Sequence, residues 1–247
     1  MKILIIPDVH GRSFWKKAIL SGKYDKIVFL GDYVDPYELE SVTNTMAIVN
    51  FKEILSLKAC HPKKVILLLG NHDLSYLSDH YRRIAASDRY DYEHQEVLKS
   101  LYCDNKRFFK LAYEERIGST KYLFSHAGVT QSWLDLNKKV IIEPDVAHLN
   151  HLLKTKKGIE TLTQVGKVRY GDYPSGSIVW ADSSELAESE PIPNIYQIVG
   201  HTMQYDNPLI TDKFACLDCR AAFSLDEEGG IKPVTEITPY DECIYYL

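Results

Sequence analysis

The sequence predicts an α/β fold, and three observations carry that prediction. Short apolar runs, each about as long as a buried strand, alternate with helical patterns over the first third of the chain. This order implies parallel strands, because parallel neighbours need a long crossover that a helix usually provides. Further strand and hairpin patterns follow in the second half. No repeat, low-complexity tract or linker divides the 247 residues, so we expect one domain over residues 1–247.

The first third of the chain contains three expected strands and two expected helices. Strands are expected at residues 3–6, 26–30 and 65–69, where the continuous apolar runs 3–6, 27–30 and 65–69 are typical of strands buried on both faces. Ser13 is placed to cap the first helix. The second helix is expected over residues 43–57, and Pro62 follows its end. Helical spacing assigns its inward positions to Met46, Val49, Ile54 and Leu57.

The middle of the chain is more polar. Residues 76–108 are rich in tyrosine and expected to be helical, with inward positions at Ile84, Val97, Leu98 and Leu101. A hairpin pattern follows, with arms at residues 109–115 and 121–124.

The last part of the chain mixes short helices and strands. Helices are expected over residues 130–136 and 145–153, the second with Asp145 as its N-cap. Strands are expected over residues 178–180 and 195–199. The tail from Phe214 onward has the pattern of closing antiparallel strands.

Composition and charge exclude several kinds of partner. A net charge of −5 and a pI near 6.0 give no general attraction to nucleic acid or anionic membrane, although a small phosphorylated substrate remains compatible. No apolar run approaches the length of a membrane span, and the apolar start is short for a signal peptide. Five cysteines without a framework spacing suit reduced thiols. We therefore expect a cytoplasmic protein with no membrane partner.

Five of the expected strands end in polar signatures. These are Asp8-Val9-His10, Gly31-Asp32, Gly70-Asn71-His72-Asp73, His126 and Gly200-His201. In open α/β folds the carboxyl ends of the strands are where ligands bind. Carboxylate, imidazole and amide oxygen together suit manganese, iron or zinc better than copper(I) or an iron–sulfur cluster.

The pattern predicts a two-metal site centred on Asp32. One ion would be held by Asp8 and His10, a second by Asn71, His126 and His201, and Asp32 would bridge them. Such sites hold their ions ~3.5–4 Å apart, and solvent between them ionises near neutral pH and acts as the nucleophile. Each signature alone has a simpler explanation, such as a core histidine or a turn residue. The ordered set is what favours a metal site.

These motifs, together with Gly31-Asp32-Tyr33-Val34-Asp35, His126-Ala127-Gly128 and Gly200-His201-Thr202, resemble the calcineurin-like metallophosphoesterases. The chain looks most like the phosphoprotein-phosphatase branch, which includes Ser/Thr protein phosphatases and symmetrical diadenosine-tetraphosphate hydrolases. The matching positions run from Asp8 to Asp218.

The resemblance implies a fold, a cofactor and residue roles. The implied fold is a sandwich of two sheets flanked by helices, in four α/β/β/α layers, with the metal site at the strand ends. The implied cofactor is a pair of divalent ions, with manganese expected first and iron, zinc or magnesium as alternatives. His72 would be the general acid, and Asp35 would hold its ring. The implied metal ligands are Asp8, His10, Asp32, Asn71, His126 and His201.

The sequence departs from this branch at positions that hold phosphate. The branch usually continues the second motif with Arg-Gly, where this chain has Pro36-Tyr37, and often has another arginine where this chain has Ala181-Asp182-Ser183. Arg12, Arg169 and Arg220 are candidate replacements, although arginines near motifs are more often surface ion pairs. Met203 stands where many relatives have a second histidine, so one ion is expected to have fewer protein ligands.

The expected function is a dinuclear metal-dependent phosphoesterase that acts on a small phosphorylated substrate or a nucleotide. The main alternative is a pyrophosphohydrolase that acts on dinucleoside polyphosphates or nucleotide ends. A phosphoprotein substrate is less expected, because the phosphate-holding arginines are absent. A non-catalytic scaffold is the third alternative, and the complete set of motif residues argues against it.

Overall fold

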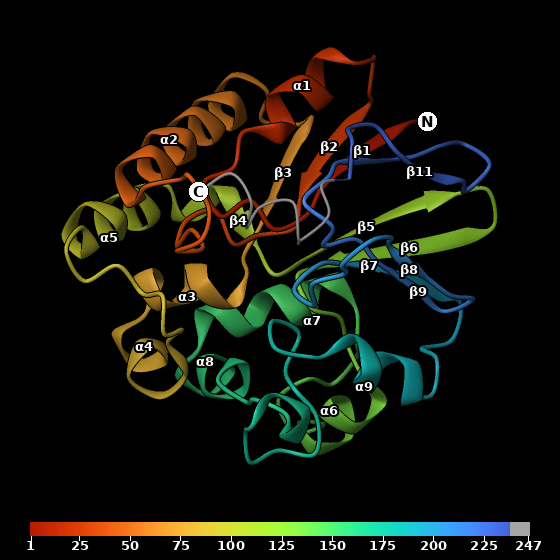
Figure 1. Ribbon diagram of the computed structural model, residues 1–247. Helices are drawn as coiled ribbons and strands as arrows, with labels where there is room; N and C mark the ends of the chain where they lie inside the picture. Colours follow the sequence, from red (N-terminus) through yellow and green to blue (C-terminus); the bar gives the residue numbers. More distant parts are fainter. Residues whose placement is uncertain (238–247) are drawn as a thin grey trace.

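Two β-sheets pack face to face, and helices cover the outer face of each (Figure 1). The computed structural model describes residues 1–237. The arrangement confirms the predicted α/β fold of two sheets flanked by helices. The end of the expected C-terminal tail, residues 238–247, lies outside the described residues, and the single domain over residues 1–247 stays a prediction.

The first sheet is built on three parallel strands, β1 (Ile3–Ile6), β2 (Lys26–Phe29) and β3 (Val65–Leu68). The parallel strand β4 (Phe109–Lys110) continues the sheet beside β3. On the other side, β10 (Phe223–Leu225) and β11 (Ile231–Pro233) add antiparallel strands. Every residue of β1 and β3 is buried, as expected for strands covered on both faces.

The second sheet begins with the antiparallel hairpin of β5 (Ala112–Ile117) and β6 (Thr120–Ser125). Next to β6 lies the parallel strand β7 (Ile195–Val199), followed by β9 (Phe214–Cys216), which is also parallel, and by the antiparallel β8 (Leu209–Ile210). The loops that follow β6 and β7 therefore emerge side by side, because these two strands run in the same direction.

Alternate side chains of β1 enter two different cores. Ile3 and Ile5 belong to the apolar layer between the sheets, together with Phe124 of β6. Leu4 and Ile6 belong to the layer under the helices. This alternation is the period of a β-strand, and it fixes which way each strand faces.

Helices α1 (Phe14–Leu20) and α2 (Asn44–Cys60) lie on the outer side of the first sheet (Figure 1). The remaining α-helices are α3 (Asn71–Leu77), α4 (Asp79–Ala85), α5 (Gln95–Asp104), α6 (Gln131–Leu136), α7 (Val146–His151), α8 (Lys156–Leu162) and α9 (Ser183–Glu188). Short 3₁₀ helices are formed by Lys106–Phe108, Leu152–Lys154 and Lys167–Arg169. No helix among residues 1–237 is long and apolar enough to cross a membrane.

Some predicted inward positions are wrong. Met46 and Val49 of α2 are 52% and 54% exposed, because α2 turns Ile48 and Phe51 toward the core in their place, whereas the predicted inward position of Ile54 is confirmed. Apolar residues lie on both sides of this helix, so helical spacing alone did not identify the buried side. Ile84 of α4 and Val97 of α5 are also exposed.

Three predicted strand assignments also need correction. Residues 178–180 form no strand but a buried turn, closed by the Trp180 and Ala181 amides, which both donate to the Ser177 carbonyl. Residues 109–110 pair with β3 rather than with the hairpin. The tail from Phe214 divides between the two sheets, and its first strand is parallel to β7 rather than antiparallel. Long-range strand pairing decided the last two, and local patterns do not report it.

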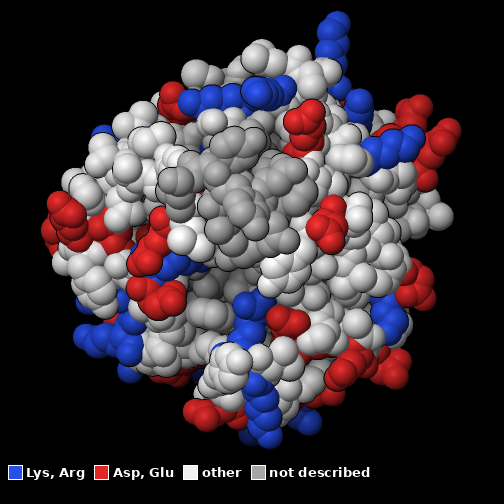
Figure 2. All heavy atoms as spheres, viewed as in Figure 1, with Lys and Arg blue, Asp and Glu red and all other residues white. Residues whose placement is uncertain are grey.

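Basic and acidic side chains are interspersed over the face of the molecule shown in Figure 2, among the residues that the structure describes. This distribution accords with the small net charge of −5. It provides no continuous basic track of the kind that binds nucleic acid on this face.

Candidate metal centre

Side chains that follow four strands line one cavity of about 280 Å³, and the buried His126, which follows a fifth, contacts two of the lining residues, Asn71 and His201. The loops after β1, β2 and β3 bring in the first four predicted ligands, and the loops after β6 and β7 bring in His126 and His201. The structure therefore brings together all six predicted ligand residues: Asp8, His10, Asp32, Asn71, His126 and His201.

The carboxylate of Asp32 lies between two groups of histidines. Its Oδ2 atom is 3.6 Å from Nε2 of His10 and 3.5 Å from Nε2 of His126. Metal-capable atoms of His10, Asp32 and His72 lie within 4.8 Å of one another, and those of Asp32, His126 and His201 form a second such group. Asp32 is the member that both groups share.

His126 presents a ring nitrogen that suits a cation. Its Nδ1–H donates to the Leu30 carbonyl at 3.0 Å, so in the neutral ring Nε2 carries a lone pair. That Nε2 lies 3.0 Å from Oδ1 of Asn71 and 3.1 Å from Nδ1 of His201. Two electron-pair acceptors at such a distance need a proton or a cation between them, and the donor types match a divalent metal.

His10 is oriented in the same way. Its Nδ1–H donates to the backbone carbonyls of Val34 and Asp35 at 2.9 and 3.0 Å, which directs Nε2 toward Asp32. Backbone acceptors of this kind are what usually orient a metal-binding histidine. His201 contributes a second observation, because its Nε2 atom is buried without a hydrogen-bond partner in the described part of the chain.

The protonation states also favour a cation. Burial, helped by the positive charge of nearby Arg89, lowers the pKa of His10 well below its usual value. Burial and the Arg169 charge do the same to His201. Both rings are therefore neutral at pH 7, as metal ligation requires. Burial also raises the pKa of Asp32, and the negative charges of Asp73 and Asp8 raise it further.

Two glycines let the carboxylates approach the backbone. A Cβ atom on Gly70 would lie 2.0 Å from Oδ1 of Asp32, and one on Gly200 would lie 2.1 Å from Oδ2 of Asp8. The Asp8 carboxylate accepts the His201 backbone N–H at 2.9 and 3.1 Å, which ties the first motif to the last. Any larger residue at either glycine would displace a predicted ligand.

Four residues of the site adopt the left-handed backbone conformation that non-glycine residues avoid: His10, Asp32, Asp35 and His201, with φ values of 44°, 50°, 59° and 66°. Such conformations persist only where the surrounding contacts enforce them, and they concentrate at functional sites. Here they turn each motif sharply as it leaves its strand.

Asp73 links the loop that contains Asp32 to the loop that contains Asn71. Its carboxylate accepts the backbone N–H groups of Asp32, Tyr33 and Gly70 at 2.8, 3.1 and 2.7 Å, and it also accepts the hydroxyl of Tyr102. The sequence analysis quoted Asp73 within its motif and assigned it no role. Its completely buried carboxylate holds the Asp32 loop against the Asn71 loop.

His72 lies beside the ligand cluster and pairs with Asp35. Its Nδ1 donates to Oδ2 of Asp35 at 2.8 Å, and Tyr76 donates its hydroxyl to the other oxygen of that carboxylate. Its Nε2 faces the cavity, 4.0 Å from Oδ2 of Asp32. This is the geometry of a histidine that exchanges a proton at Nε2 while a carboxylate fixes its ring.

The three candidate phosphate-binding arginines are engaged by carboxylates. Arg12 donates to both oxygens of Glu40, at 2.8 and 2.9 Å. Arg220 lies 3.2 Å from the same carboxylate. Arg169 does line the cavity, but it pairs with Asp182 at 3.1 Å.

Arg89, which the sequence analysis did not select, lines the cavity directly. It comes from the loop between α4 and α5 and lies 3.2 Å from Nε2 of His72. No motif or strand end marks this position, so only the folded arrangement reveals it.

The model of the calcineurin-like phosphoesterase family matches residues 1–205 of this chain. The chain is also 29% identical over 157 residues to a probable serine/threonine-protein phosphatase of Encephalitozoon cuniculi (strain GB-M1), a match that covers 62% of this chain and 32% of that protein. The chain thus spans about a third of the length of this curated relative.

Two solved phosphatases share the fold. A cold-active protein tyrosine phosphatase superposes with a TM-score of 0.57 at 16% identity, covering 95% of this chain and 79% of that one. A protein serine/threonine phosphatase of Saccharomyces cerevisiae superposes with a TM-score of 0.56 at 15% identity, covering 98% and 82%. Because the family model matches residues 1–205, which is most of the chain, the chain belongs to the calcineurin-like phosphoesterases.

Proposed function

We propose that this protein hydrolyses a phosphomonoester bond of a small phosphorylated substrate with the help of two divalent metal ions. One observation carries the proposal: a single buried carboxylate, Asp32, is shared by two groups of potential ligands, and the His72–Asp35 pair lies at its side. Shared carboxylates of this kind are how two ions are held close together.

The residues fit two ions. Asp8 and His10 would hold the first, and the second would be held by the three residues around the His126 ring nitrogen, Asn71, His126 and His201. Asp32 would contact both. When bound, the ions supply Lewis-acid activation of the phosphoryl group and of a water molecule. Manganese is the metal we expect first, because the donors are mixed nitrogen and oxygen.

His72 would deliver a proton to the leaving oxygen from Nε2. Burial alone lowers the pKa of His72, but the carboxylates of Asp32 and Asp35 outweigh it, and the pKa is raised overall. Asp35 fixes the ring and is itself fixed by Tyr76, so Nε2 stays directed at the cavity. A departing alkoxide would then leave as a neutral alcohol.

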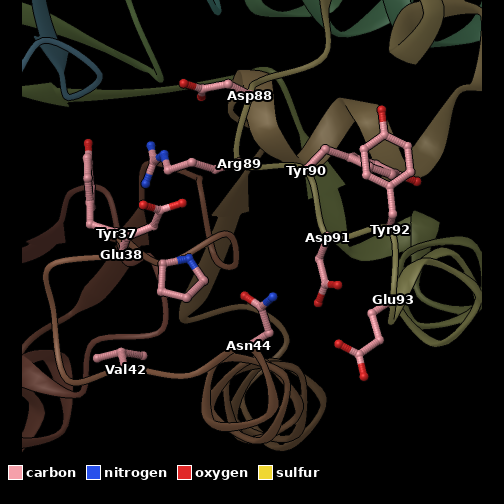
Figure 3. Close-up of a pocket in the computed structure, with 11 residues that line it drawn as sticks. Tyr37, Glu38, Val42, Asn44, Asp88, Arg89, Tyr90, Asp91, Tyr92 and Glu93 are labelled. Atoms are coloured by element: carbon pink, nitrogen blue, oxygen red, sulfur yellow. The ribbon is translucent and has the colours of Figure 1, made fainter.

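The surroundings of the site favour a monoester over a polyphosphate. A groove of about 460 Å³ adjoins the cavity and shares Tyr37, Asp88 and Arg89 with it (Figure 3). Four carboxylates line the groove, those of Glu38, Asp88, Asp91 and Glu93, against one arginine. A chain of further phosphates would meet this negative charge, so the dinucleoside-polyphosphate alternative is disfavoured.

A direct test is to titrate metal-free protein with Mn²⁺ and to compare hydrolysis of phosphomonoesters, phosphodiesters and dinucleoside polyphosphates with Mn²⁺, Fe²⁺, Zn²⁺ or Mg²⁺. We expect about two ions per chain and the highest kcat/KM on a small monoester. At most one ion at saturating metal, or a preference for dinucleoside polyphosphates, would contradict the proposal.

A further inference from the structure

Arg89 is the one arginine of the cavity whose guanidinium has no carboxylate partner among residues 1–237. Its Nη1 donates to the backbone carbonyl of Asp35 at 2.9 Å, and its Nη2 lies 3.2 Å from Nε2 of His72. Arg169, which also lines the cavity, pairs with Asp182. Arg89 therefore brings to the metal centre a positive charge that no residue in the described part of the chain neutralises by an ion pair.

The position of Arg89 is held by its neighbours. The guanidinium stacks on the ring of Tyr37, 3.7 Å from the ring centroid, and Figure 3 shows the two side chains pointing toward one another. The Asp35 carbonyl fixes one end of the guanidinium. The stacking contact and the hydrogen bond to the Asp35 carbonyl occupy one face and Nη1 of the guanidinium. Nη2 is then available to bind a ligand in the cavity.

The contact between Arg89 and His72 marks where the phosphoryl group would lie. If His72 protonates the leaving oxygen from Nε2, that oxygen and the phosphorus bonded to it must come next to Nε2. A donor only 3.2 Å from Nε2 is then within reach of a non-bridging oxygen on the same phosphorus. A phosphate oxygen is also a stronger acceptor than a neutral ring nitrogen, so Nη2 would exchange one for the other.

We propose that Arg89 binds the non-bridging oxygens of the substrate's phosphoryl group and so replaces the arginines that this chain lacks at Pro36 and after Trp180. This inference rests on the proposed phosphomonoesterase function. It assigns the phosphate contact to a loop between α4 and α5, rather than to the motif loops. Tyr37, which stands directly after Pro36, serves as the platform that holds the arginine in place.

The test compares Arg89→Ala and Arg89→Lys with Arg83→Ala, a control that removes an exposed arginine of α4. Binding of inorganic phosphate to the manganese-loaded protein is measured by calorimetry and as competitive inhibition of hydrolysis. We expect Arg89→Ala to weaken phosphate binding about 10–100-fold, the value of one or two charge-assisted hydrogen bonds. Arg89→Lys should recover only part of this loss, because lysine lacks the planar fork, and Arg83→Ala should change nothing.

Two further measurements separate a phosphate contact from a structural role. Guanidinium ion added to Arg89→Ala should restore part of the phosphate affinity, and the metal content should stay at the wild-type value. The ratio of rates on alkyl and nitrophenyl phosphates should change far less than in His72→Asn, because His72 keeps its hydrogen bond to Asp35.

Unchanged phosphate affinity in Arg89→Ala would overturn the inference. So would a changed alkyl-to-nitrophenyl ratio with intact phosphate affinity, since Arg89 would then only position His72. Failure of the proposed function looks different: the wild-type protein would hydrolyse no phosphomonoester, while phosphate binding would still depend on Arg89.

Discussion

His72 and Asp35 form a buried pair, with Nδ1 of the imidazole 2.8 Å from Oδ2 of the carboxylate. Asp35 reaches this position through a left-handed backbone conformation, φ 59°, three residues after Asp32. The pair therefore links the proposed proton donor to the loop that carries Asp32, the proposed shared metal ligand. A single sharp turn of the chain after β2 positions both functions.

Replacing His72 by asparagine tests the proton transfer. General acid catalysis typically contributes ~10²–10⁴-fold, and most where the leaving group is a poor one. We expect His72→Asn to slow hydrolysis of an alkyl phosphate by about that factor and nitrophenyl phosphate much less. Asp35→Asn should show a milder form of the same pattern. Rates on both esters and the metal content of each variant are the measurements.

Equal losses on the two esters, or loss of metal from His72→Asn, would remove His72 from the acid role. The second outcome has a structural basis, because a metal-capable atom of His72 lies within 4.8 Å of those of His10 and Asp32. Metal content therefore has to be measured in the same preparations.

The shared position of Asp32 predicts a hierarchy among ligand variants. Mutating a residue that only orients a metal ligand typically lowers metal affinity or activity by about 10–100-fold. We expect Asp32→Asn to lower activity by more than about 100-fold and to weaken binding of both ions. His10→Ala and Asn71→Ala should each weaken binding of mainly one ion. Elemental analysis and metal titration distinguish these cases. A variant Asp32→Asn that keeps one ion at wild-type affinity would show that the carboxylate does not bridge.

Sequence patterns predicted the parts of the site that local chemistry dictates. Asp32 and Asn71 each follow a continuous apolar strand, and strand ends that share one direction must meet at one edge. The structure explains why residues 70 and 200 are glycines, because a Cβ atom at either position would collide with the carboxylate of a predicted ligand. Their presence beside the ligands was part of the sequence pattern, but its reason was not.

Three positions show what local sequence patterns do not report. Arg89 comes from a loop without periodicity, 17 residues after the histidine that it approaches. Arg12 is near a motif in sequence, yet its guanidinium donates hydrogen bonds to both carboxylate oxygens of Glu40. Met46 matched helical spacing but lies on the solvent side of α2. In each case the position of the side chain depends on the residues that the fold brings next to it. A local sequence pattern does not identify these residues.

Substrate size is expected to matter as well. The cavity of about 280 Å³ is small, and the groove beside it is lined by the carboxylates of Glu38, Asp88, Asp91 and Glu93. We expect phosphoserine peptides to be hydrolysed at least about tenfold less efficiently than small esters, because residues flanking the phosphoserine would bury groove carboxylates without partners, at about 1–3 kcal/mol each. Comparing kcat/KM for glycerol phosphate and a phosphoserine peptide checks this. Turnover of a folded phosphoprotein at the rate of the small ester would contradict it.

Asp218 predicts a pH dependence of stability in the metal-free protein. Burial, together with the nearby negative charge of Asp8, raises the pKa of this carboxyl to about 7. In the unfolded chain it titrates near 3.9, so between these values the folded state binds more protons than the unfolded state. Linkage then requires that this group's contribution to stability is present at low pH and is lost as the pH rises from about 4 to about 7.

Asp218→Asn should therefore stabilise the metal-free protein at pH 8, by on the order of 2 kcal/mol, and have little effect at pH 4. Asparagine keeps the shape of the side chain and removes the buried charge. Asp212→Asn, a change at an exposed carboxylate of the same region, is the matched control and should show no such dependence. Urea unfolding at both pH values measures the difference. A stabilisation of equal size at pH 4 and pH 8, or destabilisation at pH 8, would show that ionised Asp218 is compensated by its neighbours, among them Arg12 and Arg220, whose charges lower its pKa.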